Sequence, residues 1–315
     1  MAETAPTPAS ERPGLRLRLR RARRRLMFLG VQMLLRQLAF DGAHRVGRTL
    51  GDLQYRFGGG LRRRMERDLA RLLGRPEGDA AVRETLRESY RVNDAAVFEI
   101  MALMERRQDA ALLAARCDIQ GLDALRAATA PGRGAILLAA HMGNAALLPI
   151  RLAQEGWPVS VIYKQSRMGS DGFFHAGFER YGVQPIVANA GIRAYGQMLA
   201  ALKQGRVVFI MLDQGVKKAA DGLPQRFLGK TMSMPAGPAQ LARTARAPVL
   251  PVATTAASPV WRFSIGEPVP LGHATLGEDL AALVAATERV VLAHPELWSW
   301  HHRRWRHFPL AAEGH

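Results

Sequence analysis

A histidine at the end of a short apolar run is the residue of this chain best placed to do chemistry. The run 135–140 (AILLAA) has the composition of a buried strand and leads directly into His141. Gly143 and Asn144 follow, and both are residue types that open turns or begin helices. Because α/β folds place functional groups at the carboxyl ends of their strands, we expect His141 at such an edge. Its natural chemistry there is proton transfer as a general base.

Two other strand-like runs also end in polar residues. The run VSVIY ends before Lys164, and the run VVFIML ends before Asp213 and Gln214. A carboxylate that directly follows buried residues needs a partner or a role. If these strands are parallel neighbours, Asp213 reaches the same sheet edge as His141 and becomes its best candidate partner.

Other common chemistries lack their sequence signatures. There is no Walker loop, no dinucleotide fingerprint and no HExxH zinc motif. The single cysteine, Cys117, excludes an intrachain disulfide and a thiolate metal site. Ser170 lacks the first glycine of a nucleophile elbow, and His301 and His302 are adjacent, which is poor spacing for joint ligation. We therefore expect no metal and no cofactor, and a His141 that acts on a bound hydroxyl.

Alternating strand-like and helical runs begin at about residue 116. They predict an α/β fold, with a mostly parallel central sheet flanked by helices on both faces. The expected strands are 135–140, 159–163, 184–187, 207–212, 249–255 and 261–265. The expected helices are 62–73 and 79–104 before the sheet, then 144–154, 172–181, 193–203, 236–246 and 278–293. The chain thus divides into a disordered tail (1–14), a basic helical region (15–115) and an α/β core (116–315), the last two forming one continuous domain.

The positive charge is concentrated near the N-terminus. The whole chain carries a formal charge of +17, and residues 1–75 hold eighteen arginines, no lysines and six acids, a net of +12. Basic segments bind phosphates, so anionic lipid and nucleic acid are the competing partners.

The segment 26–40 (LMFLGVQMLLRQLAF) favours lipid. Fifteen residues are too few for a helix that crosses a membrane, which needs about 20. On a helix, Gln32 and Arg36 continue one polar stripe from the upstream arginines, which leaves Met33 and Leu34 on an apolar face. Such a helix lies in the membrane interface, so residues 12–40 are expected to bind an anionic membrane surface. The alternative is a helix docked on the protein's own core. Nucleic acid is disfavoured because no zinc-finger or RNA-binding signature occurs.

Four segments, taken in order, carry a family resemblance. They are His141-Met-Gly-Asn-Ala-Ala146, Val161-Ile-Tyr-Lys164, Phe209-Ile-Met-Leu-Asp-Gln214 with its continuation to residue 242, and Pro295-Glu-Leu-Trp-Ser-Trp-His-His-Arg-Arg-Trp305. Over about residues 20–309 the chain resembles the lipid A biosynthesis acyltransferase family, within the lysophospholipid acyltransferase superfamily. The basic and apolar N-terminal segment is similar to the membrane anchor of that family.

The resemblance implies a reaction. A fatty acyl group leaves a thioester of acyl carrier protein or coenzyme A and joins a hydroxyl of a lipid or glycolipid, with His141 as the base. It also implies work at the cytoplasmic face of the bacterial inner membrane. Besides the catalytic His141 and Asp213, the expected substrate-binding residues are Gly143, Asn144, Lys164, Gln214, Arg226, Arg303 and Arg304.

One position departs from the family pattern. The family places Glu or Asp five residues after the histidine, and this chain has Ala146. The acid orients the imidazole and stabilises its charged form. Asp213 is the best substitute, and Glu99, Glu155 and Asp171 are poorer ones. An alternative function is therefore a weakened or inactive relative that binds lipid or acyl carrier protein.

The C-terminal tryptophans have two open interpretations. Trp298, Trp300 and Trp305 have the side chains of a membrane interface, and core packing explains them equally well.

Overall fold

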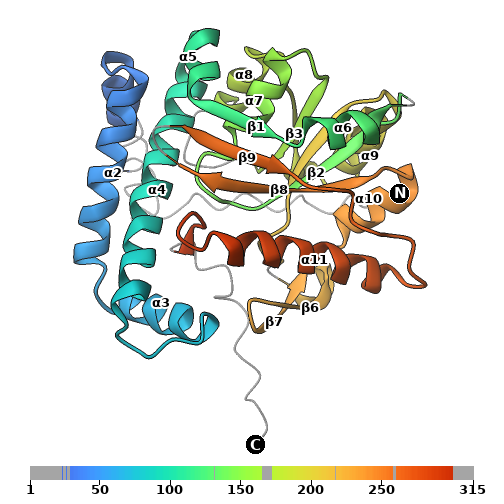
Figure 1. The fold of residues 1–315 in the computed structure, drawn as a ribbon. Helices are drawn as coiled ribbons and strands as arrows, with labels where there is room; N and C mark the ends of the chain where they lie inside the picture. The colour runs from blue at the N-terminus through green and yellow to red at the C-terminus, as the bar shows by residue number, and fades with distance from the viewer. Residues whose placement is uncertain are drawn as a thin grey trace, which may run out of the picture.

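The computed structural model describes residues 23, 26, 29–130, 132–164, 172–216, 218–257 and 260–300. A seven-stranded sheet with helices on both faces forms the centre of the molecule, and a pair of long helices stands at one side of it (Figure 1). The predicted fold class, α/β with a mostly parallel sheet, is confirmed.

The sheet has the order β1-β9-β8-β2-β5-β3-β4. Its strands are β1 (Cys117–Gln120), β2 (Ala135–Ala139), β3 (Val159–Tyr163), β4 (Gln184–Val187), β5 (Val207–Met211), β8 (Val249–Ala256) and β9 (Trp261–Ile265). Only the β8–β9 contact is antiparallel among the pairs of this sheet that the structure describes. Strands β2, β5 and β3 are parallel neighbours, so their carboxyl ends meet at one edge. All five residues of β2 are buried, which explains its continuous apolar sequence.

Helices cover the two faces of the sheet. In the view of Figure 1, α5 (Ala110–Ala115), α6 (Leu122–Thr129), α7 (Leu147–Gln154) and α8 (Phe173–Glu179) lie above it, and α11 (Leu276–Ala293) lies below. The structure also contains α9 (Ile192–Lys203), α10 (Gly237–Ala245) and the short 3₁₀ turns η1 (Ala188–Ala190) and η2 (Ala219–Asp221). Helix α11 begins with a capping box, in which Thr275 and Glu278 each satisfy the other's backbone amide.

The N-terminal helices pack closely against one another. Helix α2 (Phe40–Phe57) runs beside α4 (Ala80–Glu105). Helix α3 (Gly59–Leu72) comes between them in the chain and lies at the lower end of the pair in Figure 1. Gly47 and Gly51, one turn apart on α2, face α4 so closely that a Cβ at either position would lie within 2.5 Å of its backbone. The two glycines therefore allow the close approach that brings α2 side chains to α4.

Several elements were not foreseen individually. Strand β1 is short and partly polar, and it acquires strand structure by pairing with β9, which follows it by more than a hundred residues. The hairpin of β6 (Leu223–Phe227) and β7 (Lys230–Met234) is also new, and it packs against α11. The expected helix over 26–40 is broken, because helical structure extends over 29–37 and α2 starts anew at Phe40.

Among the described helices, none combines the length and the apolar composition that crossing a bilayer requires.

Candidate active site

The carboxyl edge of the sheet brings His141 and Asp213 together. His141 follows β2 and Asp213 follows β5, and these strands are hydrogen-bonded neighbours in parallel register. The imidazole Nδ1 lies 2.6 Å from Asp213 Oδ1, and the backbone amide of His141 donates to Oδ2 at 3.0 Å. The imidazole side chain is 38% exposed, whereas Asp213 is completely buried. A reactive ring thus faces outward from a buried carboxylate.

Asp213 receives a third hydrogen bond, from the C-terminal segment. The indole Nε1 of Trp298 donates to Asp213 Oδ2 at 2.8 Å. A buried carboxylate is tolerated only where donors replace its hydration, and three N–H groups do so here. Both Trp298 and Trp300 are buried and stack edge to face, which favours the core interpretation of these residues over the membrane-interface one.

The polar contacts of Asp213 fix the tautomer of His141. An ionised carboxylate can only accept a hydrogen bond, so the ring proton resides on Nδ1 and the acceptor electron pair of the ring is on Nε2. Gln214 places its side-chain nitrogen 3.4 Å from that Nε2. The arrangement is suited to removing a proton from a hydroxyl at Nε2, with the positive charge stabilised by Asp213.

The segment 141–146, here called the histidine turn, is held by the C-terminal segment 295–300. The amide of Ser299 donates to the carbonyl of His141 at 3.1 Å, and the amide of Gly143 donates to the carbonyl of Leu297 at 3.0 Å. Residues of α4 then hold the C-terminal segment. Ser89 donates its hydroxyl to the Trp298 carbonyl, and Asn93 donates its amide to the Leu297 carbonyl.

Sequence reasoning missed these supporting residues. Ser89 and Asn93 lie four residues apart on α4, and both are buried. A polar pair at that spacing on the buried face of a helix is the signal that would have revealed them.

The predicted site residues have different positions. Gln214 is at the histidine, and Lys164 is exposed at the end of β3, which reaches the same sheet edge. Asn144 is completely buried and donates its amide to Glu99, so its side chain supports the turn and is not open to a substrate. Arg226 is exposed on β6, in the separate hairpin. Arg303 and Arg304 lie outside the described residues.

The substitute acids are also separated by the structure. Ala146 is half-buried at the start of α7, and Asp213 is the carboxylate found against the His141 ring. Glu155 pairs with Arg151 at the end of α7, and Asp171 lies outside the described residues. Glu99 contacts the histidine turn through Asn144.

A second histidine–carboxylate pair has nearly the same local geometry. His273 Nδ1 lies 2.7 Å from Asp279 Oδ1, and the His273 amide donates to the same oxygen at 3.0 Å. This pair sits at the start of α11, where Asp279 also accepts from the Gly272 amide. It orders the loop that leads into a helix, so it provides a matched structural comparison for the pair at the sheet edge.

The fold and the edge site define an α/β protein with an oriented histidine base at the carboxyl end of parallel strands. The family model of bacterial lipid A biosynthesis acyltransferases matches residues 14–307, and the chain belongs to this family. The resemblance seen in the four sequence segments is confirmed, and the protein is an acyltransferase.

Similar proteins are found among mycobacterial acyltransferases. A phosphatidylinositol mannoside acyltransferase of Mycobacterium tuberculosis (strain ATCC 25618 / H37Rv) is 29% identical over 254 residues, which cover 76% of each protein. The phosphatidylinositol mannoside acyltransferase of Mycolicibacterium smegmatis (strain ATCC 700084 / mc(2)155) is 28% identical over 196 residues, 60% of this chain and 61% of the relative.

Proposed function

We propose that the protein transfers a fatty acyl group from a thioester of acyl carrier protein or coenzyme A to a hydroxyl of a glycolipid, with His141 as the general base. The observation that carries the proposal is the 2.6 Å contact between His141 Nδ1 and Asp213, which orients the ring and assigns the proton-accepting electron pair to Nε2. The glycolipid acceptor is suggested by the similarity to phosphatidylinositol mannoside acyltransferases.

The proposed step balances without a cofactor. The acceptor hydroxyl loses its proton to His141 Nε2 as its oxygen attacks the thioester carbonyl carbon. The tetrahedral intermediate collapses, the carbon–sulfur bond breaks, and the imidazolium returns the proton to the thiolate. Asp213 accepts from the imidazolium throughout and does not itself take up the proton.

Binding to the membrane surface is the second part of the proposal. On the helix over 29–37, Leu35 is buried and Gln32 and Arg36 contact Glu105 at 2.7 and 2.5 Å, whereas Met33 is 68% exposed. Leu29 and Leu34 are exposed as well. One side of this helix therefore packs on the protein through Leu35, and the other side leaves Leu29, Met33 and Leu34 available to a lipid phase.

Helix α2 has exposed apolar side chains of its own. Leu50, Leu53 and Phe57 are exposed at spacings of three and four residues, and Phe57 is 83% exposed. Together with the basic N-terminal segment, this surface supports action at a membrane interface. We propose the cytoplasmic face of the bacterial inner membrane, where the acyl thioesters would be available.

The test of the reaction uses purified full-length protein, a labelled acyl carrier protein thioester or acyl-CoA, and vesicles that contain a mannosylated phosphatidylinositol. We expect label in the glycolipid, and loss of transfer in His141→Ala. The matched control is His273→Ala, which removes the other histidine–aspartate pair and is expected to transfer normally.

Equal transfer by the wild type and His141→Ala would overturn the proposed base. Binding of the thioester or the lipid with no transfer from either donor would instead support the alternative of a non-catalytic relative.

A further inference from the structure

The carboxylate of Glu99 is a buried junction between three parts of the fold. It lies on α4, and its side chain is only 3% exposed. Its Oε1 lies 2.6 Å from Nδ1 of His44 on α2. Its Oε2 accepts from the indole Nε1 of Trp261 on β9 and from the side-chain amide of Asn144, both at 2.7 Å. Each contact replaces hydration that the buried carboxylate has lost.

Asn144 links the Glu99 carboxylate to the histidine turn. It lies three residues after His141, it is completely buried, and its backbone carbonyl accepts from the Leu147 amide at the start of α7. Fixing the Asn144 side chain therefore fixes the connection between the end of β2 and α7.

Trp261 restrains the same turn from the side. Gly143 has φ +52°, and a Cβ built on it would lie 2.1 Å from the Trp261 ring. The glycine therefore meets two requirements, a left-handed backbone and direct contact with the indole. Because Glu99 also accepts from this indole, it holds both surfaces against which the turn is packed.

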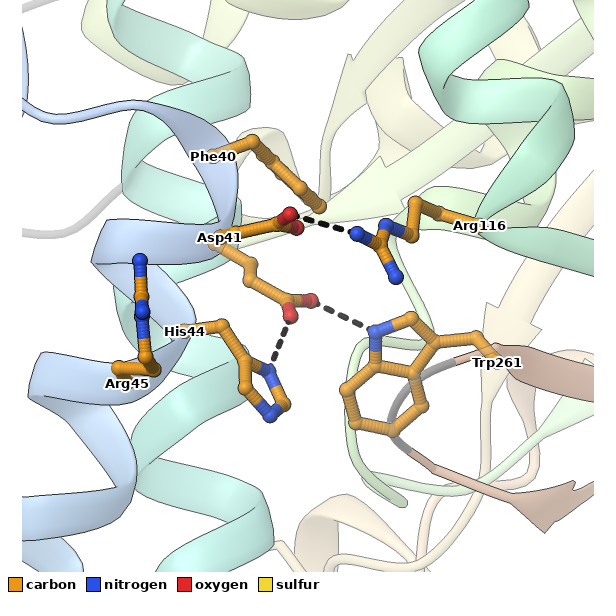
Figure 2. Close-up of a pocket in the computed structure, with 7 residues that line it drawn as sticks. Phe40, Asp41, His44, Arg45, Arg116 and Trp261 are labelled. Carbon is orange, nitrogen blue, oxygen red and sulfur yellow. Dashed lines mark hydrogen bonds and ion pairs between the residues drawn. The ribbon is translucent and has the colours of Figure 1, made fainter.

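The His44 side of the junction lies close to the surface, since the His44 side chain is 13% exposed. A cavity of 270 Å³ borders it, with His44 of α2 and Trp261 of β9 on its walls (Figure 2). Figure 2 shows both side chains directed at the carboxylate between them.

We propose that Glu99 is a positioning residue for the histidine turn, acting on His141 through Asn144. This inference rests on the proposed function of His141 as the base. Asp213 would orient the ring, while Glu99 would set where the turn presents it. Misplacement by about 1 Å can cost on the order of 10²-fold in rate.

The main test is a charge-pair rescue measured by kcat and KM of acyl transfer. Asn144→Asp places two carboxylates against each other, and we expect kcat to fall by about 10²-fold with KM changed less than about 3-fold. Adding Glu99→Gln to that variant removes one of the two facing charges and should recover kcat several-fold, but not fully, because the Glu99 oxygen that meets position 144 also accepts from the Trp261 indole. Failure of Glu99→Gln to recover any activity in this background would overturn the proposal.

The single variants supply a second, independent measurement. Glu99→Gln alone should stay within about tenfold of wild type, because its amide oxygen can still accept from Asn144 and Trp261. Glu99→Ala should lose about 10²-fold in kcat, and Asn144→Ala should add little to that loss, because the two residues act through one contact. Independent, multiplying losses would show that Glu99 does not act through Asn144.

Glu88→Ala is the control for general weakening of the α2–α4 contact. Glu88 is on the same helix and pairs with Arg48 of α2 at 2.8 Å, but it belongs to neither the dyad nor the turn. It is expected to keep the wild-type kcat. A loss equal to that of Glu99→Ala would assign the effect to helix packing and overturn the inference.

The experiments distinguish a failure of the positioning role of Glu99 from a failure of His141 as the base. If His141→Ala abolishes transfer while the Glu99 and Asn144 variants retain it, only the positioning role is wrong. If His141→Ala transfers normally, the proposed base is wrong as well.

Discussion

His141 and Asp213 are joined at two points, through the imidazole Nδ1 at 2.6 Å and through the backbone amide at 3.0 Å. The second bond matters because it ties the carboxylate to the backbone that carries the ring. A carboxylate five residues along the chain, as the family pattern has it, would approach the ring from the start of α7. Here the acid comes from the neighbouring strand β5, and its position is set by the register of β2 against β5.

Replacing the acid should therefore impair catalysis strongly. We expect Asp213→Asn to lower kcat by between about 10² and 10⁴-fold, the upper figure being the loss known for the analogous change in a Ser-His-Asp protease. The physical reason is that an amide in place of Oδ1 disfavours the tautomer with an unprotonated Nε2 and withdraws the charge that stabilises the imidazolium. The measurement is kcat for acyl transfer at saturating donor and acceptor.

Asp279→Asn is the control for this change. It perturbs the histidine–aspartate pair at α11, so it should affect thermal stability without changing kcat. Wild-type kcat in folded Asp213→Asn would contradict the assigned role.

Restoring the family acid should have little effect. The substitution Ala146→Glu puts a carboxylate at the start of α7, but the Nδ1 side of His141 already has Asp213 as its partner. We expect kcat to stay within about 3-fold of wild type, because Nδ1 has a single proton and Asp213 already accepts that hydrogen bond. A gain of 10²-fold or more, measured in the same transfer assay, would mean that the natural protein lacks a working acid.

The sequence predicts that His141 and Asp213 meet at the ends of two strands. It does not predict the contacts of Glu99 and Trp298 that support them. Apolar runs followed by His141 and by Asp213 predicted two strands with polar residues at one edge, and a parallel sheet brings those ends together. The contact of Glu99 with Asn144 depends on how α4 packs beside the sheet, and no local pattern encodes that packing. Trp298 is a second example of a contact that the sequence does not predict. A tryptophan suits the membrane interface and the core equally well, and the fold directs its indole to Asp213.

Short-range patterns also failed where partners lie far apart in the chain. Strand β1 lacks a strand-like sequence pattern, and among the described residues it acquires strand structure by pairing with β9. The helix boundary at residues 38–39 was missed since the apolar composition of 26–40 is continuous across it.

The exposed apolar side of the N-terminal helices gives a prediction about membranes. Replacing Leu29, Met33 and Leu34 together by Ser should reduce pelleting with vesicles that contain anionic lipid by at least about tenfold, since each buried aliphatic side chain contributes about 1.5–3 kcal/mol to transfer from water. Binding of the wild type should also weaken as salt is raised, because salt screens the attraction between the arginines and the lipid phosphates. Pelleting with vesicles, at low and high salt, is the measurement.

A triple substitution to Ser at Ala110, Ala111 and Ala114 on α5 controls for altered solubility. If vesicle binding persists after both the apolar substitutions and deletion of residues 1–40, this surface is not the membrane anchor.

The buried carboxyl of Asp94 predicts an unusual dependence of stability on pH. Burial raises the pKa of Asp94 from 3.8 to about 6. A raised carboxyl pKa means that the folded state holds the proton more tightly than the unfolded state. The ionised form therefore destabilises the fold above about pH 6, and this cost disappears as pH falls from about 6 to below 3.8.

Asp94→Asn should consequently stabilise the protein at pH 8, by up to about 3 kcal/mol, and bring no gain below its unfolded pKa. Asp52→Asn, in the same contact between α2 and α4, should behave oppositely. The hydrogen bond from Arg87, opposed by burial and aided by Arg91, lowers the pKa of Asp52. Its ionised form thus stabilises the fold above the ordinary carboxyl pKa, and the benefit is lost as pH falls through the lowered value. Urea unfolding of both variants at about pH 3 and pH 8, below and above the ordinary carboxyl pKa of 3.8, separates the two signs, and a loss of stability in Asp94→Asn at pH 8 would refute the role of burial.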